Sequence, residues 1–72
     1  MTGQRIILVQ PLADGWAVVC AGLEPLVFRS GGRAEAAAKR LALALAKLGR
    51  AVQVRVLDRS RNLVGARVYP AV

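Results

Sequence analysis

The chain lacks most of the side chains that perform chemistry. Of its 72 residues none is His, one is Cys and four are acidic. Without His and with a single Cys, it offers no ligand set for a zinc-type metal centre. The four carboxylates are far apart in the sequence, in turns or near a helix start, so they form no catalytic pair. The sequence therefore predicts no enzyme activity, cofactor, metal site or small-molecule substrate.

Disulfides and membrane segments are also missing. A single Cys excludes an internal disulfide, and the apolar neighbours of Cys20 predict a buried thiol. No apolar stretch approaches the roughly 20 residues of a membrane-spanning helix. The first ten residues carry one charge and an apolar run too short for a signal peptide. We expect a cytoplasmic protein in a reducing compartment, without membrane contact.

Positive charge and apolar side chains are what the chain does have. Eleven Lys and Arg residues against four acidic ones give a formal net charge of +7, and 56% of the residues are hydrophobic. Residues 1–32 hold two basic and two acidic side chains, so the whole surplus belongs to residues 33–72. The apolar content is too high for disorder, and the length allows one domain, residues 1–72.

The hydrophobic pattern predicts five strands and one helix. Strands are expected over residues 5–10, 16–21, 26–29, 51–57 and 63–69, with residues 11–15 as a five-residue hairpin loop. A helix is expected over 33–48, where Ala, Leu, Lys and Arg dominate. The order β-β-β-α-β-β belongs to the α+β class, as one antiparallel sheet with the helix packed across one face.

The helix has two distinct faces. Gly32 is expected as its N-cap, Glu35 as its third residue and Gly49 as the left-handed residue that ends it. A helical period places one apolar stripe toward the sheet, formed by Ala34, Ala37, Ala38, Leu41, Leu45 and Leu48. The opposite face carries five cations, Arg33, Lys39, Arg40, Lys47 and Arg50. They are typical either of phosphate-backbone binding or of a solvated face that keeps a small apolar protein in solution.

The second face of the sheet lacks a cover. In the last hairpin, alternation separates Val52, Val54 and Val56 from an outer set, Gln53, Arg55, Arg67 and Tyr69. The first hairpin is apolar on both faces, so the pattern leaves open which of its faces the helix covers. One helix covers one face, and we expect the other to mediate homodimerisation. The candidate residues are Ile6, Leu8, Ala17 and Val19.

Two aromatic residues are candidates for stacking on a nucleic-acid base. Trp16 follows a turn and precedes an apolar strand, which favours a place in the core over a stacking role. Tyr69 lies two residues from Arg67 and is the better stacking candidate, although one aromatic side chain is far from an RNA-reading sheet.

Four short motifs occur in a recognisable order. They are VQP at 9–11, DGWAV at 14–18, RAEA at 33–36 and VYP at 68–70. In this they resemble a small bacterial family, a domain of unknown function marked by VVP…GWAV…TKAEA…YG or YP. The resemblance covers nearly the whole chain and implies the same fold and a bacterial cytosolic origin. It supplies no catalytic residue.

The chain departs from this family pattern at three places. Gly32 stands where a Thr N-cap is usual, and Val19 where Lys or Arg is common. Residues 59–62 replace an Asp-Gly type of turn. The change at Val19 adds apolar surface to the first hairpin and favours homodimerisation.

Two functions are compatible with the sequence. The first is a small basic module that binds DNA or RNA through phosphates, using the five helix cations and a second group, Arg55, Arg59, Arg61 and Arg67. The alternative is a homo-oligomeric protein–protein interaction module that uses the apolar sheet face, with the charge serving solubility.

Overall fold

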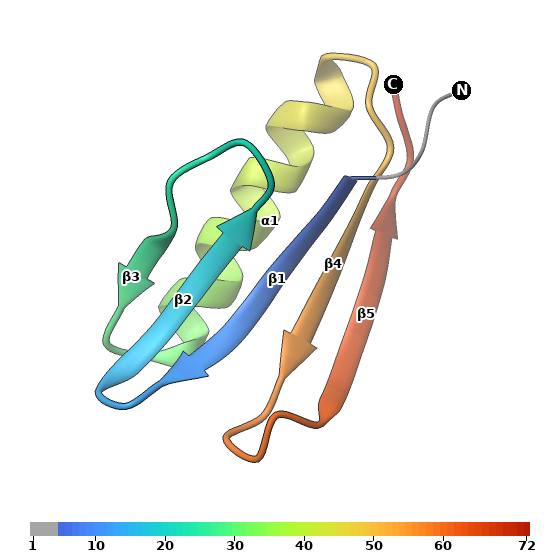
Figure 1. The fold of residues 1–72 in the computed structure, drawn as a ribbon. Helices are drawn as coiled ribbons and strands as arrows, with labels where there is room; N and C mark the ends of the chain where they lie inside the picture. The colour runs from blue at the N-terminus through green and yellow to red at the C-terminus, as the bar shows by residue number, and fades with distance from the viewer. Residues whose placement is uncertain (1–4) are drawn as a thin grey trace.

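The computed structural model describes residues 5–72 and confirms the predicted order and class (Figure 1). Its elements are β1 (Arg5–Leu12), β2 (Gly15–Cys20), β3 (Leu26–Phe28), α1 (Gly31–Lys47), β4 (Val52–Leu57) and β5 (Leu63–Tyr69). The helix packs across one face of a five-stranded sheet. Residues 1–4, part of the segment considered above for a signal peptide, lie outside this range.

The sheet is not antiparallel throughout, and this part of the prediction is wrong. Its strand order is β3-β2-β1-β4-β5, and the central pair β1–β4 is parallel while the other three pairs are antiparallel. The reason is the crossover by α1. The helix carries the chain back along the sheet to the end where β1 starts, so β4 runs in the direction of β1 (Figure 1).

The first hairpin is tighter than the sequence predicts. β1 continues through Pro11 to Leu12, and Leu12 pairs with Gly15, so the turn contains two residues instead of five. Pro11 pairs with Trp16 on β2, whereas the pairing of β1 with β4 ends at Val9. The missing N–H of Pro11 therefore lies beyond the parallel ladder, where it removes no hydrogen bond from it.

The core lies between the sheet and α1. Its sheet side is formed by buried residues of three strands, Ile7, Val9, Val18, Cys20, Val52 and Val54, and burial of Cys20 is as predicted. The helix side consists of Ala34, Ala37, Ala38, Ala42 and Ala46. Leu41 and Leu45 pack at its margin, while Leu48, predicted to be part of the stripe, is 78% exposed. The helix is rotated so that its alanines face the sheet, and small side chains allow close approach.

Both helix ends are defined by specific contacts. Ser30, not Gly32, is the N-cap, and its Oγ accepts a hydrogen bond from the Arg33 N–H at 3.2 Å. The helix thus begins earlier than predicted, and Glu35 lies beyond its first turn. Gly49 ends it with φ 88°, as predicted. The N–H groups of Gly49 and Arg50 bond the carbonyls of Ala46 and Leu45, which is a Schellman motif.

Candidate nucleic-acid interface

The solvent side of α1 presents a row of cations. Arg33, Arg40 and Lys47 are exposed and follow one another at intervals of seven residues. Seven residues are close to two helical turns, so successive side chains are separated by about 10.5 Å along the helix. We call these three residues the helix ridge. It is the only part of the predicted interface that the described fold arranges in a line.

The other two helix cations lie away from the ridge. Arg33 and Arg40 border a hollow beside Phe28 of β3, whereas Lys39 lines a cleft on the side of β5. Arg50 lies in the connection to β4, where its backbone N–H completes the helix C-terminus. The five predicted helix cations therefore face more than one direction, and the ridge contains three of them.

The ridge side chains differ from several other arginines in having no partner within residues 5–72. In that range, guanidinium groups of Arg5, Arg55 and Arg59 donate hydrogen bonds to protein acceptors. No such bond is made by Arg33 or Arg40, or by the Lys47 ammonium. The ridge is therefore a set of exposed charges available to an external anion.

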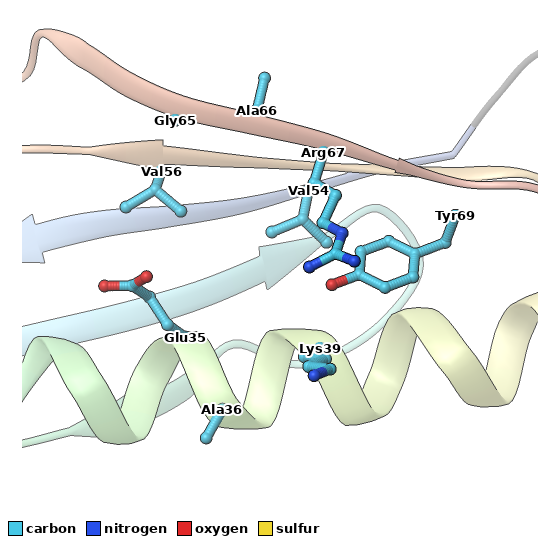
Figure 2. Close-up of a pocket in the computed structure, with 9 residues that line it drawn as sticks. All are labelled: Glu35, Ala36, Lys39, Val54, Val56, Gly65, Ala66, Arg67 and Tyr69. Carbon is cyan, nitrogen blue, oxygen red and sulfur yellow. The ribbon is translucent and has the colours of Figure 1, made fainter.

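The second predicted group does not form one surface. Arg55 lies on the sheet face away from the helix, and its Nε donates to Gln53 Oε1 at 2.8 Å. Arg59 donates to the Leu12 carbonyl at 2.7 Å. Arg61 occupies the β4–β5 loop with φ 64°. Arg67 projects toward the helix (Figure 2).

The positions of Arg67 and Tyr69 correct the predicted faces. Arg67 pairs with Val54 and Tyr69 with Val52, and directly opposed residues of antiparallel strands share a face. Both side chains are therefore on the helix side, not on the outer side with Gln53 and Arg55. Arg67 and Tyr69 share one face of β5, as predicted, but which face of the sheet this is depends on the register of β5 against β4, which shifts at Val56 and Leu57.

A cleft separates α1 from the β4–β5 edge of the sheet (Figure 2). Its volume is about 410 Å³, and its polar lining comes from Glu35 and Lys39 on α1 and from Arg67 and Tyr69 on β5. Glu35 is not among the site residues predicted from the sequence. The sequence does contain one indication of the cleft, which is Gly65. A Gly inside a strand often marks a bulge or a place where a ligand or another backbone segment comes close.

Residues 5–72 leave the sheet face opposite α1 uncovered (Figure 1). Most of the side chains that the strand pairing places on this face are apolar. The four predicted self-association residues share this face, because Leu8 opposes Val19 and their neighbours Ile6 and Ala17 follow the same alternation. Ile6 is 42% exposed, whereas Ala17 is buried beneath its neighbours. Val68 extends the face across to β5. We call it the outer sheet face, formed by Ile6, Leu8, Ala17, Val19, Arg55 and Val68.

A scan against protein-family models and searches of curated proteins and solved structures found no significant match to the chain. The family resemblance noted above stays a prediction. Within residues 5–72, no helix is long and apolar enough to span a membrane. The same residues contain no group of three or more potential metal-ligating side chains.

Proposed function

We propose that this protein is a small basic module that binds nucleic acid through the phosphate backbone, with the helix ridge as the contact surface. The supporting observation is the alignment of Arg33, Arg40 and Lys47 on the solvent side of α1. Aligned cations neutralise successive phosphates and release condensed counterions, which provides affinity without reading base edges.

Titration of duplex and single-stranded DNA at two salt concentrations tests this function. Non-specific binding of this kind has dissociation constants of about 10⁻⁴ to 10⁻⁶ M at physiological salt and weakens steeply as salt rises. We expect binding at low salt and a large loss of affinity at high salt. No detectable binding at low salt would contradict the proposal.

Homodimerisation through the outer sheet face is a second candidate function. The observation that favours it is the exposure of Ile6 and Val68 on a mostly apolar face that residues 5–72 leave uncovered. The helix that carries the ridge covers the other face of the sheet (Figure 1), so a dimer formed through the outer sheet faces leaves both ridges accessible. Light scattering coupled to size exclusion tests it, and a monomer at high protein concentration contradicts it.

A further inference from the structure

The cleft between α1 and β5 brings charges of both signs over an apolar floor (Figure 2). Val54, Val56 and Gly65 form the floor. Glu35 and Lys39 are one helical turn apart on one wall, and Arg67 and Tyr69 are two residues apart on the same face of β5. Each wall thus carries a cation, Lys39 on α1 and Arg67 on β5. The phenol of Tyr69 lies beside Arg67, and the carboxylate of Glu35 lies on the helix wall.

Arg67 and Tyr69 form a stacked pair within the cleft. The guanidinium carbon of Arg67 is 5.4 Å from the centroid of the Tyr69 ring, within the range of a cation–π interaction. This contact holds Arg67 against the ring, and its guanidinium points toward the helix (Figure 2). Lys39 lines the cleft from α1, so one cation borders the cleft on the helix side and one on the β5 side.

We propose that the cleft binds one nucleotide of a single strand, with its phosphate between Lys39 and Arg67 and its base over Val56, beside Glu35 (Figure 2). This inference rests on the proposed function and adds a ligand class to it. A volume of about 410 Å³ is within the range of small-molecule sites, about 300–1,000 Å³. A base in an intact duplex is stacked and paired, so only an unstacked base can enter.

Glu35 gives the cleft a base preference. A carboxylate accepts hydrogen bonds and donates none when ionised, so it favours a base edge with an exocyclic amino group. Cytosine and thymine are both single-ring bases, but cytosine presents an amino group where thymine presents a carbonyl oxygen. The carboxylate of Glu35 attracts the amino group of cytosine and repels the carbonyl oxygen of thymine. The cleft should therefore prefer cytosine over thymine.

The experiment compares fluorescein-labelled oligo(dC) and oligo(dT) of one length with a mixed-sequence duplex, by fluorescence anisotropy at neutral pH. Since a hydrogen bond to a charged acceptor contributes more than a neutral one, we expect oligo(dC) to bind at least about tenfold more tightly than oligo(dT). Free dCMP and dTMP, followed by NMR shifts of the Gly65 and Tyr69 amides, distinguish a nucleotide within a strand from a free one.

Three variants connect the preference to the cleft. Glu35→Gln should remove the difference between oligo(dC) and oligo(dT), and Glu24→Gln is its control because it makes the same change in a distant turn. Gly65→Val should weaken both single strands and leave duplex binding unchanged. A Cβ at Gly65 meets only Val56 Cβ at 3.8 Å, so the strand accommodates the side chain while the cleft becomes narrower. Circular dichroism confirms that each variant is folded.

Each outcome decides the inference. A cytosine preference that Glu35→Gln removes and Glu24→Gln retains supports it. Equal binding of oligo(dC), oligo(dT) and duplex overturns the inference but leaves phosphate-backbone binding in place. Binding of dCMP without binding of oligo(dC) assigns the cleft to a free nucleotide and overturns the inference. No binding of any probe overturns both this inference and the proposed function.

Discussion

The guanidinium carbon of Arg59 lies 4.8 Å from the centroid of the Trp16 ring. This contact joins the β4–β5 loop to the first hairpin, and the hydrogen bond from Arg59 to the Leu12 carbonyl strengthens the same connection. On its other side, Trp16 packs against the core and against Gly31 at the start of α1. Trp16 is half-buried and packs against the core it was predicted to join, and Arg59 is engaged within the protein.

Replacement of Arg59 should affect stability more than nucleic-acid binding. Arg59→Gln removes the cation–π contact and changes the donor to the Leu12 carbonyl, and we expect unfolding free energy to fall by about 1 kcal/mol. Urea denaturation measures the change. Arg61→Gln is the matched control, since it removes the same charge from the same loop without those contacts. Equal midpoints for the two variants would contradict the structural role of Arg59.

The helix ridge should account for more of the salt dependence than the other arginines. The double variant Arg33→Gln with Arg40→Gln removes two ridge charges and should reduce the slope of log affinity against log salt by about 2. The control, Arg55→Gln with Arg61→Gln, removes the same net charge from the outer sheet face and a loop. Anisotropy titrations with one duplex at several salt concentrations measure both slopes. Identical slopes would show that only net charge matters.

A charge on the outer sheet face should prevent self-association. Leu8 and Val19 are opposed on neighbouring strands of that face, so Leu8→Lys or Val19→Lys places an ammonium at its centre. Burying that charge in an apolar interface without a partner is unfavourable, and we expect the variants to be monomers. Leu43→Lys is the control because Leu43 is exposed on α1. Light scattering reports the mass, and a dimer that survives both sheet variants would exclude this face.

Gly15 should tolerate no side chain. A Cβ at this position would collide with the carbonyl oxygen of Phe28 on β3, and a backbone group cannot move away as a flexible side chain can. Gly15→Ala should therefore lower the free energy of unfolding by about 1–3 kcal/mol, the usual cost of overpacking. Gly32→Ala is the control, since a Cβ there meets nothing within 4 Å and Ala favours the helix. Thermal denaturation compares the two variants, and equal melting temperatures would contradict this prediction.

The sequence predicts the helix cations well but does not predict the cleft. The exposed cations of α1 follow from helical periodicity, because a helix fixes the relative directions of its own side chains. The cleft could not be predicted in the same way. It combines Glu35 and Lys39 of the helix with Arg67 and Tyr69 of β5, and their meeting depends on the pairing of β5 with β4. That pairing is a contact between strands, with a register shift that no local pattern encodes.

The sequence by itself determined the order β-β-β-α-β-β, the end of the helix at Gly49 and the burial of Cys20. These features depend on residue type and short-range periodicity, which act along a few neighbouring residues. Only the tertiary structure decided that β1 and β4 are parallel and that Arg67 faces the helix. Crossover direction and strand register arise from packing between segments that are distant in the sequence. The sequence therefore predicts the alternation within each strand, but not which faces of different strands lie on the same side of the sheet.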